Sequence, residues 1–340
     1  MKKVSVLFIV FTLILASCGK DGMPVNTNDT PTNLVVTAVV NPDNSGNVTF
    51  TSTATNAVSY TYNFGNGIFQ TAVTGSVTYK FPASGTYTVN STAKSSSGKT
   101  LTKSIEVTVT VNLSLVWSDE FNTDGAPDPT IWGYDLGAGG WGNNESQNYT
   151  NRPQNSIVQG GTLKINLIKE NYSGSPYTSA RLISKDKYSF NYGRVEIRAK
   201  LPAGGGTWPA IWMLGSNINS SPWPSCGEID IMEHIGNDLN KIYGTLHYPG
   251  RFGGNADGGS RVIANATTEF HKYSLEWSAT SISIFVDDLL IHSVTNTISL
   301  PFNKNFFFIL NIAMGGNFGG TIDSAVTAAT MEIDYIRVYQ

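Results

Sequence analysis

Three carboxylates lie within seven residues near the middle of the chain, in the sequence GEIDIME at positions 227–233. Their neighbours are isoleucine and methionine, and charge is costly to bury among such side chains. In a β-strand, alternate side chains share a face, so Glu228 and Asp230 lie together while Ile229 and Ile231 point into the opposite layer. On a helix the three acids would spread around the axis, so the pattern favours a strand.

Glu233 is out of phase with the other two acids. It lies three positions after Asp230, so it reaches the same face only if one extra residue around positions 231–232 is absorbed in a β-bulge. Bulges re-aim side chains beside active sites. We therefore predict a bulge at this point of the strand.

The spacing of these acids suits the cleavage of a glycosidic bond. A retaining glycosidase holds two carboxyls about 5 to 5.5 Å apart, one as nucleophile and one as acid/base. Asp230 between them would raise the proton affinity of a neighbour and help one glutamate stay protonated while the other is ionised. Two alternatives remain open from the residues alone: a solvated edge strand, and a calcium or magnesium site made of three hard oxygen ligands.

Composition favours β-structure and excludes several functions. Of 340 residues only 14% are charged and 11% are aromatic, and the net charge is −3. Without a polycationic segment, we expect no binding to nucleic acid. We also find no Gly-x-Ser-x-Gly elbow, phosphate-binding loop, Cys-x-x-Cys pair or His-Glu-x-x-His helix, and expect no catalytic cofactor.

The N-terminus has the features of an export signal. Two lysines precede an apolar run over 4–16, too short to span a membrane comfortably. The following Leu15-Ala16-Ser17-Cys18 resembles the lipobox of bacterial lipoproteins, which implies cleavage before Cys18 and lipidation of its thiol. We expect a signal peptide at 1–17, a flexible linker at 18–30, and a lipid-anchored protein of the cell envelope, in the outer membrane of a Gram-negative bacterium. An ordinary signal peptide with an incidental cysteine is the alternative. With Cys18 lipidated, Cys226 has no partner for a disulfide.

Residues 31–112 are predicted to form a small β-sandwich. Threonine- and valine-rich runs at 34–40, 47–54, 59–64, 75–81, 85–93 and 101–111 alternate with turns rich in glycine and asparagine. The sequences YNFGNG at 62–67 and YKFPASGTYTV at 79–89 resemble those of PKD domains, which are immunoglobulin-like. Asn63, Asn66 and Tyr62 replace the acidic and tryptophan residues usual in that family. The resemblance implies a spacer module, and carbohydrate binding is the alternative.

Residues 113–340 are predicted to form one large all-β domain. Alternation recurs at 162–168, 193–201, 243–247, 271–277, 281–286, 306–313 and 331–338, and helical periodicity is nearly absent. Seven segments occur in the order found in glycoside hydrolase family 16: WSDEFN at 117–122, GWGNNESQNYT at 140–150, GTWPAIWML at 206–214, GEIDIME at 227–233, GTLHY at 244–248, NIAMGGN at 311–317 and MEIDYIRVY at 331–339. The extra residue between the second and third acids resembles the laminarinase-like branch.

This resemblance implies a concanavalin A-like jelly-roll sandwich with a sugar cleft on its concave face. It implies that Glu228 is the nucleophile, that Glu233 is the acid/base and that Asp230 assists. Trp208 and Trp212, four residues apart, are expected to stack on sugar rings, because indole faces complement the C–H faces of a pyranose. The other expected substrate-binding residues are Trp141, Asn143, Arg181, His247 and Asn311. The resemblance also implies a structural calcium ion at Glu120, Gly161 and Asp334, whose carboxylate and carbonyl oxygens suit that ion.

The expected partner is a polysaccharide, and we expect a monomer. The leading hypothesis is a retaining endo-glycosidase that cleaves β-1,3 linkages of laminarin-type or mixed-linkage β-glucans. One alternative is the same machinery acting on a marine galactan such as agarose, porphyran or carrageenan, although the low basic content disfavours sulfated substrates. Another is a glucan-binding surface lipoprotein without catalysis, and a third is a transglycosylase using the same intermediate.

Overall fold

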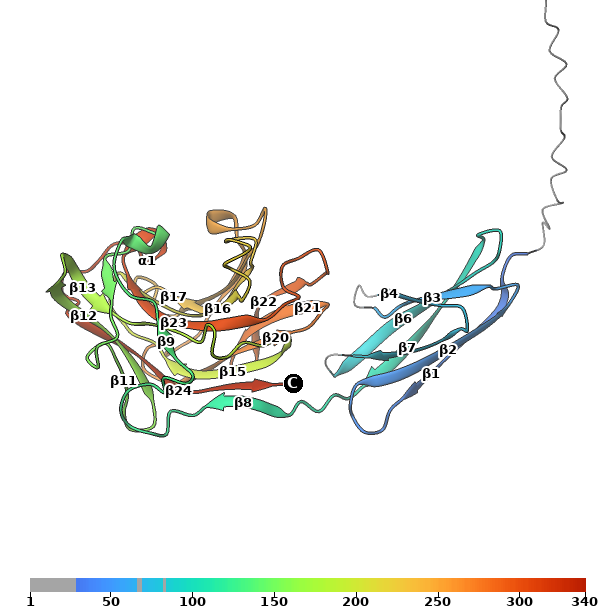
Figure 1. Cartoon of the computed structure of the whole chain (residues 1–340), viewed down its shortest axis with the longest axis horizontal. Helices are drawn as coiled ribbons and strands as arrows, with labels where there is room; N and C mark the ends of the chain where they lie inside the picture. Colours follow the sequence, from blue (N-terminus) through green and yellow to red (C-terminus); the bar gives the residue numbers. More distant parts are fainter. Residues whose placement is uncertain (1–28, 66–68, 82–83) are drawn as a thin grey trace, which may run out of the picture.

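The computed structural model describes residues 29–65, 69–81 and 84–340. Within these residues the regular secondary structure is almost wholly β-strand (Figure 1). The signal segment, Cys18 and most of the expected linker lie outside the described residues. Among the described residues, no helix has the length and apolar character needed to cross a membrane.

The N-terminal strands form two sheets around a core of their own. One sheet has the order β1-β2-β5 and the other β4-β3-β6-β7. Between them are buried aromatic residues such as Phe50, Tyr62, Phe64 and Phe81. The strands are β1 (Thr32–Val40), β2 (Asn47–Thr55), β3 (Ser59–Asn63), β4 (Phe69–Ala72), β5 (Ser76–Lys80), β6 (Gly85–Lys94) and β7 (Thr100–Val109). Each run expected from the sequence becomes a strand, and β4 is a strand that the sequence pattern did not indicate.

A second and larger sandwich begins at Leu115. Its outer sheet has the order β10-β13-β12-β24-β15-β20-β21-β22, with β11 paired to β12 and β8 paired to β24. The outer-sheet strands are β8 (Leu115–Asp119), β10 (Gln147–Tyr149), β11 (Ser156–Val158), β12 (Leu163–Tyr172), β13 (Ser175–Ser179), β15 (Gly193–Lys200), β20 (His271–Trp277), β21 (Ser281–Val286), β22 (Leu289–Thr295) and β24 (Ala328–Tyr339).

The inner sheet carries the site and has the order β19-β18-β17-β16-β23-β14-β9. Its strands are β9 (Gly133–Tyr134), β14 (Arg181–Ile183), β16 (Thr207–Gly215), β17 (Glu228–His234), β18 (Lys241–His247), β19 (Asp257–Val262) and β23 (Phe306–Met314). Three short helical turns accompany the sandwich: η1 (Gly140–Gly142), η2 (Gly253–Asn255) and α1 (Gly316–Gly319). The predicted all-β, jelly-roll architecture of this part is confirmed.

The core between the two sheets explains why one face of β17 is apolar. Ile229, Ile231 and Met232 are fully buried there against residues of the outer sheet such as Ile197 and Leu275. Because these three side chains occupy the core, Glu228 and Asp230 face the other side of the inner sheet. The apolar residues of the GEIDIME sequence thus fix the direction in which its acids point.

Candidate active site

The bulge predicted in the acidic strand is present. On β16, Met232 pairs with Ile211 and Asp230 pairs with Trp212, so Ile231 is the extra residue. The pairing with β18 slips at the same place, between Asp230 and Glu233. The bulge prediction is therefore confirmed from both neighbouring strands.

The register shows what the bulge achieves. Opposite Glu228, Asp230 and Glu233, the strand β16 places its alternate residues Leu214, Trp212 and Ala210. On the other side, β18 places His247, Thr245 and Tyr243. Alternate residues share a face, and all six of these neighbours line one cavity together with the three acids. The bulge therefore places Glu233 on the same face of the sheet as Glu228 and Asp230.

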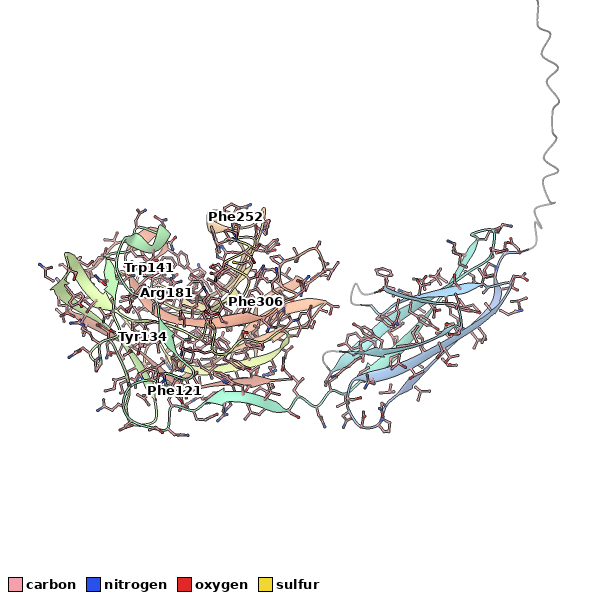
Figure 2. The ribbon with its side chains drawn as sticks, viewed as in Figure 1. Phe121, Tyr134, Trp141, Arg181, Phe252 and Phe306 are labelled. Carbon is pink, nitrogen blue, oxygen red and sulfur yellow. The ribbon has the colours of Figure 1, made fainter. Side chains whose placement is uncertain are left out.

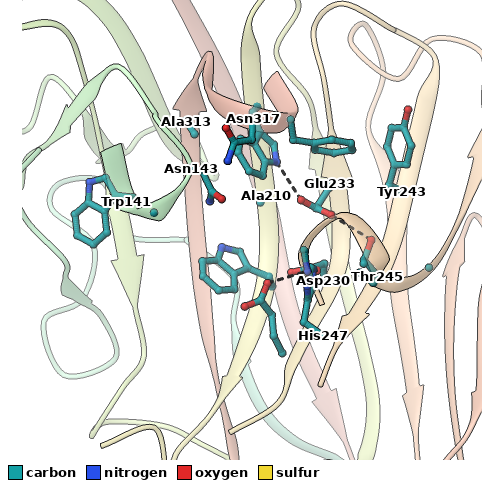
Figure 3. A pocket seen from close by; sticks show the side chains of 18 of the residues that line it. Trp141, Asn143, Ala210, Asp230, Glu233, Tyr243, Thr245, His247, Ala313 and Asn317 are labelled. Atoms are coloured by element: carbon teal, nitrogen blue, oxygen red, sulfur yellow. Dashed lines mark hydrogen bonds and ion pairs between the residues drawn. The ribbon is translucent and has the colours of Figure 1, made fainter. Parts of the chain in front are cut away.

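This cavity has a volume of about 910 Å³ and lies over the inner sheet (Figure 3). It contains every substrate-binding residue expected from the sequence: Trp141, Asn143, Arg181, Trp208, Trp212, His247 and Asn311. Figure 2 shows Trp141 and Arg181 on one side of the sandwich and Phe252 on the rim across from them. Residues that are far apart in sequence thus meet in one cleft large enough for a sugar chain.

Glu228 has one hydrogen-bond donor and lies beside one imidazole. Trp223 Nε1 donates to its Oε2 at 2.8 Å, and His247 Nε2 lies 3.6 Å from its Oε1. Burial raises the pKa of Glu228 well above its usual range, and the neighbouring Asp230 raises it further, whereas His247 and Trp223 lower it. Gly227 precedes this glutamate with a φ of 80°, and a Cβ there would lie 2.9 Å from Phe306 Cζ. Only glycine fits at this turn into the strand.

Glu233 accepts hydrogen bonds from a different pair of side chains. Trp208 Nε1 donates to Oε1 at 3.0 Å, and Thr245 Oγ1 donates to Oε2 at 3.2 Å. Burial raises the pKa of this carboxyl, and the Trp208 and Thr245 hydrogen bonds oppose that rise. A hydroxyl can also accept a hydrogen bond, whereas an indole N–H can only donate. Thr245 can therefore serve Glu233 in both protonation states.

Asp230 lies between the two glutamates and is the most deeply buried of the three acids, with 3% of its surface exposed. Burial raises its pKa well above the usual range, and the charge of Glu233 raises it further. His247 Nε2 lies 3.1 Å from Asp230 Oδ2, with the length but not the angle of a hydrogen bond. Like charges this close cannot all ionise near neutral pH, so protons are shared within the cluster.

The tautomer of His247 follows from its other ring nitrogen. The backbone N–H of Gly253 donates to Nδ1 at 3.1 Å, so in the neutral ring the proton lies on Nε2. Glu228, Asp230 and His247 are close enough for metal binding, with one polar atom of each within 4.8 Å of the others. A metal-ligating histidine donates a hydrogen bond from its other ring nitrogen, whereas Nδ1 of His247 accepts one, which disfavours the metal-site alternative.

Arg181 and Asn311, two of the expected binding residues, both contact Trp212. Arg181 stacks between the rings of Trp141 and Trp212, with its Cζ 4.8 Å from each centroid, and its Nε donates to Asp135. Asn311 accepts from Trp212 Nε1 at 2.7 Å and donates to the Tyr149 hydroxyl, so both ends of its amide are engaged. Asn311 thus orients Trp212, while one side of the Trp212 ring is covered by Arg181.

Some cleft residues were not predicted. Trp223 and Thr245 contact the acids, Glu145 lines the cavity, and Phe252 lies beside Trp223 on the rim. Glu145 accepts from Asn143 and Gln147, and burial raises its pKa. The one available signal was the position of Trp223, five residues before Glu228, the first residue of the acidic strand. The Thr245 contact depends on a strand register that local sequence does not give.

The expected calcium residues are paired with arginines. Both oxygens of Glu120 accept from Arg337, at 2.9 and 2.8 Å, and Asp334 pairs with Arg198 at 2.5 Å. Gly161 lies in the turn before β12 with a φ of 77°. The donor chemistry suits calcium, but an ion would have to displace at least one guanidinium from its carboxylate.

With this geometry established, comparison places the chain among known enzymes. The family model described as Glycosyl hydrolases family 16 matches residues 143–337, which include the whole acidic strand. A second model, Beta-glucan synthesis-associated protein SKN1/KRE6/Sbg1, matches residues 45–223 and ends before that strand. The site and sandwich therefore define a glycoside hydrolase. The chain belongs to glycosyl hydrolases family 16.

Individual relatives agree with this assignment. A beta-glucanase of Rhodothermus marinus is 46% identical over 242 residues, which cover 66% of this chain and 85% of that protein. A keratan-sulfate endo-1,4-beta-galactosidase of Sphingobacterium multivorum is 36% identical, covering 75% of this chain and 62% of that protein.

Among solved structures, the laminarinase from Rhodothermus marinus is 45% identical, with a TM-score of 0.65 and coverage of 67% of this chain and 98% of that one. The catalytic domain of an endo-1,3-beta-glucanase (laminarinase) from Thermotoga petrophila RKU-1 is 41% identical, with a TM-score of 0.64 and the same coverages.

Proposed function

We propose that this protein is a retaining endo-β-1,3-glucanase acting on laminarin-type or mixed-linkage β-glucans. Glu228 is the nucleophile, Glu233 is the acid/base and Asp230 assists. The observation that carries this proposal is the bulged strand that places the three acids on one face of the cleft. The laminarinase and endo-1,3-beta-glucanase relatives support the choice of substrate.

The hydrogen-bond donors support the division of roles between the two glutamates. Glu228 faces Trp223 Nε1 and His247 Nε2, and in this tautomer both groups can only donate. Such an environment favours a carboxylate, which is what a nucleophile must be. Glu233 has the Thr245 hydroxyl at one oxygen, and this hydroxyl can accept a hydrogen bond from a carboxylic acid or donate one to a carboxylate. An acid/base residue needs both states in turn.

The reaction then proceeds in two displacements. Glu233 donates its proton to the glycosidic oxygen while Glu228 attacks the anomeric carbon, so the leaving sugar departs with its oxygen protonated and a glycosyl-enzyme ester remains. The ionised Glu233 then takes a proton from water, and the resulting hydroxide attacks the same carbon. Glu228 is released as a carboxylate, Glu233 is protonated again, and the configuration is retained.

The decisive test is hydrolysis of laminarin by wild-type protein and by Glu228→Gln and Glu233→Gln variants. Loss of either carboxyl should lower kcat by roughly 10³-fold or more, because each acts directly in the reaction. A Glu276→Gln variant serves as the control, since Glu276 lies on the outer sheet and pairs with Arg194. Near-wild-type turnover by either cleft variant would refute the assignment.

A second candidate is the same chemistry on a galactan. The relative named as a keratan-sulfate endo-1,4-beta-galactosidase motivates it, and Arg181 is a cation in the cleft that an anionic sugar could contact. Product profiles on laminarin, lichenan, agarose, carrageenan and keratan sulfate, measured side by side, discriminate the two. They also separate hydrolysis from transglycosylation, and tight binding without new reducing ends would indicate a glucan-binding protein instead.

We further propose the organisation expected from the sequence outside the cleft. Residues 1–17 form a signal peptide, Cys18 carries lipid, 18–30 form a linker, 31–112 form a PKD-like, immunoglobulin-like spacer, and 113–340 form the catalytic domain of a monomer at the outer membrane. The separate core of the N-terminal sheets supports the spacer. Mass spectrometry of the mature N-terminus and a Cys18→Ala variant test the anchor: a variant that stays in the membrane fraction would contradict it.

A further inference from the structure

Asn143 lines the cleft (Figure 3), and all but one of its polar groups are engaged within the protein. Its backbone N–H donates to the Gly140 carbonyl and its own carbonyl accepts from the Asn317 N–H, each at 2.8 Å. Its side-chain Nδ2 donates to Oε1 of Glu145 at 3.2 Å. Within the described part of the chain, the remaining group, Oδ1, has no hydrogen-bond partner. Asn143 therefore has one free acceptor, the amide oxygen.

The other oxygen of Glu145 is fixed by a buried amide. Gln147 is fully buried, and its Oε1 accepts from the backbone N–H of Met314 at 2.8 Å. This contact turns Nε2 of Gln147 toward Oε2 of Glu145, at 2.6 Å. The Tyr149 hydroxyl donates to the same oxygen at 3.4 Å. Because an amide nitrogen can only donate, the atom in the Oε2 position must be an acceptor.

We propose that Glu145 is a positioning residue that sets the orientation of the Asn143 amide, so that its oxygen and not its nitrogen faces the sugar. If this amide turned over, Oδ1 would lie against a carboxylate oxygen, and neither atom could donate. The cleft wall therefore presents an acceptor at this point, and a neutral sugar hydroxyl is the group that donates to it. The proposal rests on the proposed function, because it names what Asn143 contributes to sugar binding.

Glutamine at position 145 should invert this arrangement. Glu145→Gln keeps the size of the side chain, but only one of its two terminal atoms can still accept. Because Gln147 needs an acceptor, the new amide oxygen takes the Oε2 position and the new amide nitrogen faces Asn143. Asn143 then turns over and points its nitrogen into the cleft. The sugar hydroxyl can accept from that nitrogen, but its own proton is left without a partner.

Aspartate at position 143 provides the matching change. In Glu145→Gln/Asn143→Asp, one aspartate oxygen accepts from the glutamine nitrogen and the other faces the sugar, so the acceptor is restored. The double variant exchanges an amide and a carboxyl between the two positions, and its net charge equals that of wild type. Asn143→Asp alone places two carboxyls at the distance of the present hydrogen bond, where like charges repel. Each single variant should therefore bind sugar more weakly.

The test is sugar binding without turnover. Isothermal titration calorimetry is performed in a Glu228→Gln background, with whichever of laminarihexaose and neoagarohexaose that protein binds more tightly. We expect Kd to rise by about 3- to 10-fold in Glu145→Gln and in Asn143→Asp, and to return to within about 2-fold of the background in the double variant. Thermal melts confirm that each variant is folded at the temperature of titration.

Asp135→Asn is the matched control for the loss of charge. Asp135 pairs with Arg181 in the same wall of the cleft, at 3.1 Å. Asp135→Asn removes a carboxylate from this wall but leaves the Glu145 contact of Asn143 in place. Adding Asn143→Asp to Asp135→Asn should therefore restore nothing.

Four results would overturn the proposal: no loss of affinity in Glu145→Gln, additive losses in the double variant, equal rescue in the Asp135→Asn pair, or binding of neither sugar. The proposed function fails in a different way. A wild-type protein that binds laminarihexaose without cleaving it would refute the glucanase, whereas the Kd values would still decide the role of Glu145.

Discussion

Replacing each of two tryptophans by phenylalanine should move opposite limbs of the pH–rate profile. Trp223→Phe removes the N–H that donates to Glu228, and Trp208→Phe removes the N–H that donates to Glu233. Both substitutions keep an aromatic ring in the cleft. Both remove a donor that stabilises an ionised carboxyl, so both raise the pKa of the glutamate concerned.

The size of each shift follows from the hydrogen bond. A hydrogen bond to a charged group contributes about 1.5–3 kcal/mol, which corresponds to about 1–2 pKa units. Trp223 is 43% exposed, so water can replace part of its contribution, and we expect about 0.5–1 unit for Glu228. Trp208 is half-buried and Glu233 is 9% exposed, so we expect about 1–2 units for Glu233.

The sign differs because the two glutamates need opposite states. Glu228 must be ionised to attack, so a higher pKa moves the acidic limb of kcat/KM to higher pH and activity at low pH is lost. Glu233 must be protonated to donate, so a higher pKa moves the alkaline limb to higher pH and activity extends upward. Because the acids share protons, these limbs report apparent pKa values of the cluster.

The assay is kcat/KM on laminarin from pH 4 to 10 for wild type and both variants. Trp141→Phe is the control, because its Nε1 donates to the Gly137 carbonyl and contacts no acid. If the alkaline limb moves in Trp223→Phe and the acidic limb moves in Trp208→Phe, the roles of the two glutamates are exchanged. Equal losses at every pH in both variants would show that neither N–H controls ionisation.

Three further predictions test other parts of the structure. Asp230→Asn should raise Tm near pH 7 by about 2–4 °C while lowering kcat at least about 10²-fold. The native carboxyl has a raised pKa, so the stability of the wild-type protein falls as pH rises from about 4 through that pKa. Thermal melts of the variant should lack this fall. Deleting Met232 leaves one residue between Asp230 and Glu233, so regular alternation should place both acids on one face without a bulge and activity should be kept. A loss of more than about 10²-fold in kcat/KM with an intact circular dichroism spectrum would contradict the bulge argument. If calcium binds at Glu120, adding it after dialysis against chelator should raise Tm in wild type but not in Glu120→Gln, and no change in wild type would show that Arg337 keeps the carboxylate.

Much of the site could be predicted because its information is local. The alternation of Glu228, Ile229, Asp230 and Ile231 determines which side chains enter the core, and the odd spacing of Glu233 requires one bulged residue. Strands β20 and β21 begin and end at the residues where the alternation does. Local patterns of this kind reflect the period of the strand.

The donors to the acids could not be predicted in the same way. Thr245 reaches Glu233 because β18 pairs with β17 in a register that already includes the bulge, and that register is a property of two strands. Trp223 reaches Glu228 through the turn at Gly227, and Gly253 reaches His247 from a loop. Such contacts depend on how segments meet, for which one sequence without pairing information carries little signal.

This division between strand and loop has a functional consequence. The strand alone places three buried carboxyls on one face, an arrangement in which burial raises every pKa and no single carboxyl is distinguished as the nucleophile. The difference arises from what each glutamate faces. Trp223 and the oriented His247 can only donate to Glu228, whereas Thr245 can both donate and accept. Substitutions in the 216–227 and 248–256 loops should therefore alter the pH dependence of turnover even where they leave the strand and the cleft shape unchanged.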